Sequence, residues 1–300
     1  PRTVVEPGSV MKRLWKSFSW TRRQKRDGER NTTAGRPYFY LGEGLALTRL
    51  KSGHFIYVDP LEESVCAHLI AHGTWEPWIE KVVLSLLRPG DHVVEVGGHV
   101  GFYTLAMAHR VGRMGSVLTF EANPRLAALS SRSIRLNGYA PWVQIVQKAA
   151  SDTSGSVRFS TSRQYGGGGH VYVGENLLGG DTQVLEVDAV RLDDLDLPRV
   201  RLLRIDAEGS EPLILAGAEN LLRQPDIILC IEWDVVQMRS RADPQQLAKK
   251  LQQMDFKFWR IAVSSELVPV DCEALGQLDA CDLVVARSEP MTRPPFLIQP

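Results

Sequence analysis

The sequence predicts an α/β protein built around a mostly parallel sheet. Two observations lead to this prediction: strand-like and helical segments alternate from His92 onward, and a glycine turn follows the first of these strands. Such alternation is typical of parallel strands joined by crossover helices. With 300 residues, 44% of them hydrophobic and 23% charged, the chain has the composition of a globular protein with a substantial core.

The charges of the chain balance, with 35 basic and 35 acidic side chains. No net charge therefore attracts nucleic acid, and we expect a small neutral or mixed-charge substrate and no nucleic-acid partner. The four cysteines lack zinc-type spacing, and no apolar run reaches the ~20 residues of a membrane span. We expect a cytoplasmic protein without a transmembrane segment, and its oligomeric state stays open.

Residues 1–36 are expected to form a flexible basic arm. Two interpretations of this arm stay open: a solvated tail, or a weak contact with a membrane surface through Trp15, Phe18 and Trp20. Its basic side chains are Lys12, Arg13, Lys16, Arg22, Arg23, Lys25, Arg26 and Arg30.

Residues 37–74 are expected to form an N-terminal extension. Two β-rich runs between residues 45 and 58 flank Lys51-Ser52-Gly53, which predicts a hairpin that serves as a lid or an added sheet edge. Pro77 then suits the first turn of a helix that ends before Pro89.

Residues 75–290 are assigned to the main domain, and residues 291–300 to a C-terminal tail. The predicted strands are 92–96, 116–121, 142–148, 201–206, 226–233, 256–263 and 283–287. The predicted helices between them are 102–110, 124–137, 210–222 and 244–254. Residues 154–192 alternate like strands around Gly166–169, which predicts an inserted hairpin with a mobile loop.

The strongest local pattern is the strand and glycine turn at residues 92–101, which read His-Val-Val-Glu-Val-Gly-Gly-His-Val-Gly. Glycines let a backbone approach a ligand closely, as in nucleotide-binding turns. Glu121 ends the next strand ~20 residues later, where an acid accepts hydrogen bonds from ribose hydroxyls. Glu95, just before the turn, suits a cationic amino-acid group and favours S-adenosylmethionine over NAD. Phosphate-binding turns stay open on spacing alone.

Carboxylates also follow two later strands. Asp206, Glu208 and Glu211 come after the strand 201–206, and Glu232 ends the strand 226–233. The carboxyl ends of parallel strands share one sheet edge, so these acids are candidates for the chemistry. A purely structural role for Glu208 or Glu211, stabilising the next helix N-terminus, stays open.

Taken in series, these motifs resemble the FkbM family of S-adenosylmethionine-dependent methyltransferases over about residues 75–233. The matching segments are Glu-Val-Gly-Gly-His-Val-Gly-Phe-Tyr at 95–103, Phe-Glu-Ala-Asn-Pro at 120–124, Leu-Asn-Gly at 136–138, Ala-Ala-Ser-Asp at 149–152, Ile-Asp-Ala-Glu-Gly-Ser-Glu at 205–211 and Ile-Glu at 231–232. The resemblance implies a Rossmann-like class I methyltransferase fold, with a seven-stranded sheet whose last strand is antiparallel. It also implies O-methylation of a sugar, glycan or secondary-metabolite hydroxyl.

The resemblance further implies roles for individual residues. Those assigned to the cofactor are Glu76, Glu95, Gly97, Gly98, His99, Gly101, Glu121, Asn123, Ala150 and Asp152. From their positions at the sheet edge, Asp206, Glu208 and Glu232 are the candidate catalytic carboxylates and Trp233 is a candidate substrate contact, whereas His170 is either a substrate contact or an exposed loop residue. The chain departs from the family at Glu95, where Asp is commoner, and at Gly98-His99, where Ala-Asn is frequent. For His99 a space-filling role stays open beside a contact with the cofactor carboxylate.

Three further questions stay open at this point. Clustered carboxylates suit Mg²⁺, so a divalent cation is a candidate second cofactor, with its ligands unknown. An NAD-dependent oxidoreductase would share the strand, turn and acid, although a Tyr-x-x-x-Lys pair is not evident. The third open alternative is that the protein is a module that binds the cofactor without catalytic activity.

Overall fold

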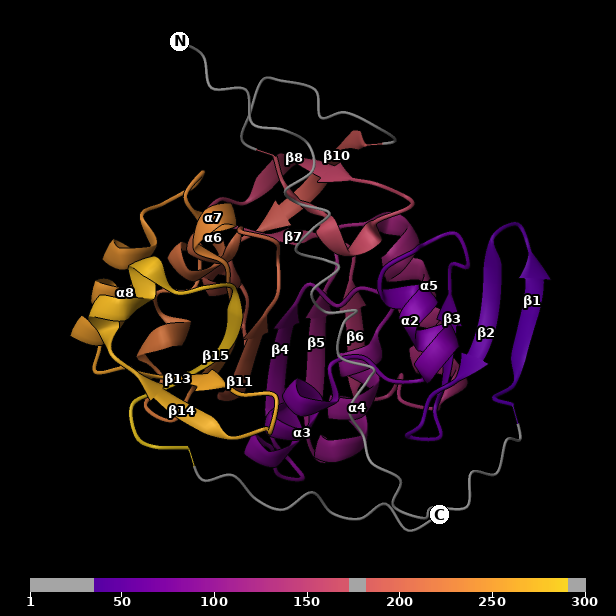
Figure 1. Ribbon diagram of the computed structural model, residues 1–300, viewed down its shortest axis with the longest axis horizontal. Coiled ribbons are helices and arrows are strands. Elements are labelled where there is room, and N and C mark those ends of the chain that lie inside the picture. The colour runs from indigo at the N-terminus through magenta and orange to yellow at the C-terminus, as the bar shows by residue number, and fades with distance from the viewer. Residues whose placement is uncertain (1–34, 173–181, 291–300) are drawn as a thin grey trace. The chain divides into compact units, whose positions relative to one another are not determined.

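The computed structural model describes residues 35–172 and 182–290, and the C-terminal tail and nearly all of the expected basic arm lie outside these residues. The described chain begins with a three-stranded antiparallel sheet (Figure 1). Its strands are β1 (Tyr38–Gly42), β2 (Leu45–Arg49) and β3 (Phe55–Val58). The hairpin expected around Lys51–Gly53 is confirmed, because β2 pairs antiparallel with β3 across this turn.

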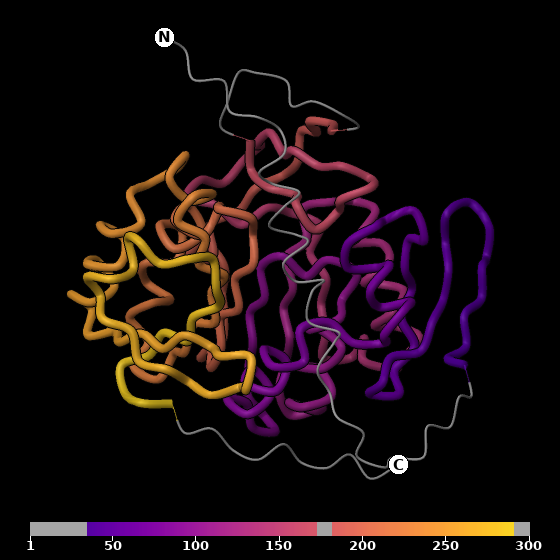
Figure 2. The backbone as a smooth tube through the Cα atoms, in the orientation of Figure 1, coloured from indigo at the N-terminus to yellow at the C-terminus, as the bar shows by residue number. Residues whose placement is uncertain are grey.

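The three-stranded sheet is not an added edge of the central sheet, as the sequence had left open. It packs against α5, where the backbone N–H of Tyr57 donates to Ser133 Oγ at 3.0 Å and that of Phe55 to Asn137 Oδ1 at 3.1 Å. His54 Nε2 also hydrogen-bonds the Tyr139 hydroxyl at 2.6 Å. These contacts fix the sheet on the outside of a helix layer (Figure 2).

The central sheet has eight strands in the order β14-β13-β15-β12-β11-β4-β5-β6. Its parallel strands are β4 (His92–Val96), β5 (Ser116–Phe120), β6 (Val143–Val146), β11 (Val200–Ile205) and β12 (Ile228–Trp233). The remaining strands are β13 (Lys257–Ile261), β14 (Leu267–Val270) and β15 (Cys281–Ala286). The last strand, β15, lies between β12 and β13 and is antiparallel to both, as expected for the class I methyltransferase fold.

The expected number of seven strands is one too low. A tight turn, in which Ala262 N–H donates to the Glu266 carbonyl and Ser265 has a φ of 68°, folds the chain back after β13. The following residues therefore pair with β13 as β14.

Helices cover both faces of the central sheet. Successive strand residues point to opposite faces, so each strand can contribute apolar side chains to both helix layers. Leu202 joins the core on the side of α3, α4 and α5, whereas Leu203 joins the core on the side of α6 and α8. The helices are α2 (Val65–His72), α3 (Pro77–Leu86), α4 (Phe102–Val111), α5 (Pro124–Leu136), α6 (Glu211–Ala216), α7 (Val235–Met238) and α8 (Pro244–Gln253). Within residues 35–172 and 182–290, none of these is both long and apolar enough to cross a bilayer.

The helix expected over residues 210–222 is shorter in the structure. A side chain at Gly217 would overlap the carbonyl oxygen of Ser151, and the chain passes there from α6 toward a short 3₁₀ turn at Leu221–Arg223. The helix α6 therefore ends at Ala216, where the chain packs closely against Ser151 at Gly217 and does not continue as a helix.

The expected inserted hairpin is confirmed, since β8 (Gly155–Thr161) pairs antiparallel with β10 (Gln183–Val190). It belongs to a four-stranded sheet that also holds β7 (Ala149–Ala150) and β9 (His170–Val171). Within this insert, Gly166–Gly168 form a 3₁₀ turn and Gly166 is buried, and the mobility expected for this loop stays a prediction. Residues 173–181 lie outside the described residues.

Candidate active site

One cavity of about 170 Å³ lies at the carboxyl ends of β4, β5, β11 and β12. In open α/β sheets, ligands bind at this edge. Ten of the residues singled out from the sequence line the cavity: Glu76, Gly97, Gly98, His99, Glu121, Ala150, His170, Asp206, Glu208 and Glu232. Trp75, Tyr103, Phe120 and Phe159 add aromatic surface to its walls.

The glycine loop begins directly after β4, and its glycines are needed for contacts within the protein. A side chain at Gly97, which has a φ of 87°, would overlap the backbone carbonyl of Asp206. A side chain at Gly98 would overlap the methyl group of Thr119, and one at Gly101 would press on Ser130 at 2.6 Å. These positions lack side chains, and the loop can therefore lie flat on the strand ends. From the sequence, the glycines were expected instead to let a ligand approach the backbone.

Glu121 follows β5 and faces the glycine loop. Its Oε2 accepts the backbone N–H of His99 at 2.7 Å, and its Oε1 accepts that of Asn123 at 2.8 Å. Burial raises the pKa of Glu121 to about 7, although these two hydrogen bonds oppose the shift. Each oxygen still has a lone pair for a further donor.

His99 has an unusual environment within the described part of the chain. Its φ of 48° is rare for a residue with a side chain, and neither of its buried ring nitrogens has a hydrogen-bond partner. Burial lowers the pKa of His99, with Glu62 and Asp206 opposing the shift. The ring lies under the turn at Gly166, where an added side chain would come within 3.4 Å of Nε2.

Glu95 lies behind the loop and does not line the cavity. Its Oε2 accepts the Thr104 hydroxyl at 2.5 Å and the Thr119 hydroxyl at 3.0 Å. Arg204, on the neighbouring strand β11, lies 3.5 Å from its Oε1. Glu95 thus serves, in this structure, to fix a buried cation beneath the cavity.

Arg204 is only 2% exposed, and it contacts the cavity with its other end. Its Nη2 donates to Asp206 Oδ2 at 2.7 Å, and its guanidinium lies over the Tyr103 ring at 3.8 Å from the centroid. Asp206 is therefore held in place by a hydrogen bond from a buried cation.

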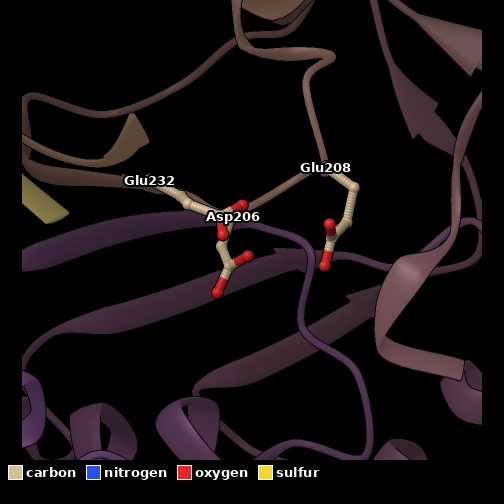
Figure 3. A group of neighbouring side chains, drawn as sticks. All are labelled: Asp206, Glu208 and Glu232. Atoms are coloured by element: carbon tan, nitrogen blue, oxygen red, sulfur yellow. The ribbon is translucent and has the colours of Figure 1, made fainter. Parts of the chain in front are cut away.

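Asp206, Glu208 and Glu232 lie together, with one carboxylate oxygen of each within 4.8 Å of the others (Figure 3). Glu208 Oε2 accepts from Gln237 Nε2 at 2.9 Å, whereas Glu232 Oε2 is buried without a partner among the described residues. Burial, reinforced by Asp206, raises the pKa of Glu208 to about 8 and that of Glu232 well above its usual range. The cluster binds protons readily and has room for a cationic ligand.

The sequence argument missed Arg204 and Asp282 as cavity residues. Asp282 lies directly opposite Glu232 on the antiparallel strand β15, and burial together with Glu76 raises its pKa well above the usual range. Burial and Asp206 likewise raise the pKa of Glu76 to about 7. A signal for Arg204 was present, because a lone cation inside an apolar strand needs a buried partner.

Five other residues singled out from the sequence lie away from the cavity, among them buried Glu211, whose Oε1 accepts the backbone N–H of Ala207 at 2.9 Å. Asn123 caps α5, where its side chain accepts from Arg125 N–H, and Gly101 lies at the start of α4. Asp152 is exposed and accepts from the Ser151 hydroxyl. Trp233 is fully buried, with Nε1 donating to the Leu275 carbonyl at 3.0 Å. At the cavity, His170 Nδ1 hydrogen-bonds the Gly168 carbonyl at 3.0 Å.

Among curated proteins, residues of this chain are similar to two methyltransferases. Methyltransferase 1 of Beauveria bassiana is 26% identical over 165 residues, which cover 48% of this chain and 66% of that protein. Protein-L-isoaspartate O-methyltransferase 1 of Archaeoglobus fulgidus is 37% identical over 60 residues, which cover 20% of this chain and 28% of that protein. The matches thus span less than two thirds of either relative.

Two solved structures are also similar to this chain. The methyltransferase FkbM of Methylobacillus flagellatus KT has 15% identity and a TM-score of 0.42, and the match covers 66% of this chain and 45% of that one. The O-methyltransferase TomG of Streptomyces achromogenes, in complex with S-adenosylmethionine, has 14% identity and a TM-score of 0.41, with 71% and 79% covered.

The family comparison matches a larger part of the chain. The model of the methyltransferase FkbM domain matches residues 95–258, which is more than half of the 300 residues. The matched segment runs from Glu95 in β4 to Phe258 in β13 and includes the glycine loop, Glu121 and the three clustered carboxylates. This chain belongs to the FkbM methyltransferase domain family.

Proposed function

We propose that this protein is an S-adenosylmethionine-dependent methyltransferase that methylates a hydroxyl of a sugar, glycan or secondary metabolite. The observation that carries the proposal is that the glycine loop, Glu121 and the carboxylates of Asp206, Glu208 and Glu232 share one cavity. Membership of the FkbM methyltransferase domain family supports the choice of methyl donor.

The cavity residues fit this cofactor in their chemistry. Glu121 offers acceptor oxygens for two ribose hydroxyls, and Ala150 and Phe120 offer apolar surface for an adenine ring. Glu76 and Asp206 would face the cationic methionine end, since both line the cavity and Glu95 does not. The unpartnered ring nitrogens of His99 would gain hydrogen bonds from a polar ligand.

Bound S-adenosylmethionine would supply an electrophilic methyl group at this cavity. The protein's part is then to align an acceptor hydroxyl and to take its proton during the transfer. Glu208 is the carboxylate we assign to the proton, because its pKa of about 8 is near neutral pH and it is free of an arginine partner. Asp206, held in position by Arg204, would orient the acceptor.

A divalent cation is the second form of this proposal. The three carboxylates of Asp206, Glu208 and Glu232 are close enough to share one ion, and oxygen ligands of this kind suit Mg²⁺. The ion would then lower the pKa of the acceptor hydroxyl, and Glu208 would be a ligand to the ion.

A transfer assay with S-adenosylmethionine labelled on its methyl group tests the proposal. The protein is incubated with small-molecule and glycan fractions of its source cell, with and without EDTA. We expect label in one of these fractions. Loss of activity in EDTA and its recovery with Mg²⁺ would select the cation form, whereas indifference to EDTA would select Glu208 as the direct base. Label confined to protein or nucleic acid would contradict the proposed acceptor.

A further inference from the structure

The outermost strand of the N-terminal sheet exposes four successive large apolar side chains. Tyr38 is 43% exposed, Phe39 51%, Tyr40 60% and Leu41 51%. Single exposed apolar residues are common, but a contiguous run of them marks an interaction surface. In Figure 1, β1 lies at the far side of β2 and β3 from the central sheet.

Both faces of β1 contribute to this surface. Tyr38 and Tyr40 pair with Thr48 and Ala46, whose side chains are buried, so the two tyrosines extend the inner face of the sheet beyond β2. Phe39 lies on the opposite face, since successive strand residues alternate. Within the described residues, neither face of β1 is fully covered.

The edge strand β1 has a bulge between Tyr40 and Gly42 but carries no charged side chain. Edge strands commonly carry charged residues that discourage pairing with other molecules. The five residues of β1 read Tyr-Phe-Tyr-Leu-Gly and include no charge. The apolar character of this strand therefore serves a contact that the described residues do not make.

Around β1 the described chain carries basic Arg36, Arg49 and Lys51, whereas acidic Glu43 directly follows the strand. The sequence of residues 1–34 contains nine Lys or Arg residues and three Asp or Glu residues. On the described sheet, exposed Arg49 follows Thr48, the partner of Tyr38, and exposed Lys51 begins the next turn. An apolar strand accompanied by basic residues is complementary to an anionic lipid surface.

We propose that β1 docks on the interfacial region of an anionic lipid bilayer. Tyrosine and phenylalanine side chains are well suited to this position, because an amphipathic or apolar ring can lie among headgroups and the upper acyl chains. The basic residues beside β1 and before it add attraction to anionic headgroups. This inference concerns where the protein works and stands independently of the proposed methyl transfer.

A second copy of the chain fits the same surface less well. Three half-exposed aromatic side chains and one leucine offer on the order of 400 Å². A stable interface between proteins buries about 800 Å² on each partner. The area of the patch alone is therefore too small to hold two copies of the chain together, whereas binding to a bilayer does not require a minimum buried area.

Vesicle sedimentation with the full chain tests the proposal. The probes are phosphatidylcholine vesicles with and without phosphatidylglycerol, at low and high salt. We expect binding to the anionic vesicles that weakens at high salt. Changing Tyr38, Phe39 and Tyr40 together to Ser should lower the partition coefficient at least tenfold. The matched control is Met114→Ser with Val263→Ser, which removes exposed apolar side chains outside this sheet and should bind as the unchanged protein does.

Two additional measurements keep the test decisive. Phe39→Glu alone, a change at one exposed position, should also weaken binding to anionic vesicles, so the test survives if the triple variant folds poorly. Light scattering gives the oligomeric state of the unchanged protein. Equal vesicle binding by the unchanged protein and Phe39→Glu, no binding by either, or a dimer that Phe39→Glu converts to a monomer would each overturn the proposal.

Discussion

Glu208 combines an uncommon backbone conformation with an uncommon carboxyl group. Its φ is 51°, a region that residues with side chains rarely adopt and that is often found at functional sites. Gln237 donates to its Oε2, and burial raises its pKa to about 8. These features place a proton acceptor of near-neutral pKa at the cavity.

Glu208→Gln should lower the turnover number by about 10²–10⁴-fold, which is the usual contribution of a general base. The unchanged enzyme should speed up as the pH rises through about 8, because the protonated carboxyl cannot accept a proton and the ionised one can. The variant should lack this rise. The measurement is turnover against pH with a labelled methyl donor. Glu219→Gln, a change at an exposed position three residues after α6, is the control. A variant at position 208 with the full rate and the same pH profile would contradict the assignment.

For individual residues, the sequence predicted where a side chain lies better than it predicted what that side chain contacts. Glu121 and Asp206 could be located because each follows an apolar strand at the ligand-binding edge of a parallel sheet. The position of Glu95 inside the strand could not show that its side chain points away from the cavity toward Arg204, since both faces of a parallel strand are buried. Asn123 and Gly101, which were assigned to the cofactor from the sequence, also have structural roles. Asn123 caps α5, and Gly101 packs closely against Ser130 of α5.

The turn between β4 and α4 is the element on which the site depends most. Gly97 has a φ of 87° and is packed against the backbone of Asp206, so the turn connects the glycine loop to the end of β11. Gly138, which follows α5, has a φ of 77° but no atom near its missing side chain. A comparison of the two glycine positions therefore distinguishes the cost of the backbone conformation from the cost of the packing contact.

Gly97→Ala should destabilise the protein by at least about 2 kcal/mol more than Gly138→Ala does, because overpacking adds to the cost of a positive φ that both positions share. Urea unfolding of both variants, followed by circular dichroism, gives the two free energies of unfolding. Equal losses would show that the contact with Asp206 does not constrain position 97. Gly138→Ala itself should cost about 1–2 kcal/mol.

Most elements could be predicted from the sequence, and those that could not share a physical cause. Strands β4, β5, β11 and β12 are long apolar runs, whereas α2 buries only Cys66 and Leu69 and so has a weak helical pattern. Strand β1 is exposed on both faces and shows no alternation, and β14 alternates too weakly to be distinguished from a loop. Short elements that pack on one neighbour leave little pattern in the sequence.

For the whole molecule, the sheet order explains why one cavity collects residues distant in sequence. Strands β4 and β11 are neighbours although about a hundred residues separate them, so the glycine loop lies beside Asp206. The alternation of elements predicted parallel strands, but their order in space and the position of β15 depend on contacts between distant residues. The resemblance to a family supplied the antiparallel last strand, which periodicity alone did not.

The central claim is that this cavity binds S-adenosylmethionine through Glu121, and calorimetry tests it most directly. S-adenosylhomocysteine and NAD are titrated into the same preparation of the unchanged protein and of Glu121→Ala. We predict that S-adenosylhomocysteine binds and NAD does not. Glu121→Ala should weaken binding at least tenfold, because each hydrogen bond to a carboxylate contributes about 1.5–3 kcal/mol.

Glu186→Ala, a change on strand β10 outside the cavity, is the control and should leave the affinity unchanged, and circular dichroism confirms that each variant is folded. The account predicts tight binding of S-adenosylhomocysteine that depends on Glu121. Binding of NAD, or an unchanged affinity for S-adenosylhomocysteine in folded Glu121→Ala, would contradict it.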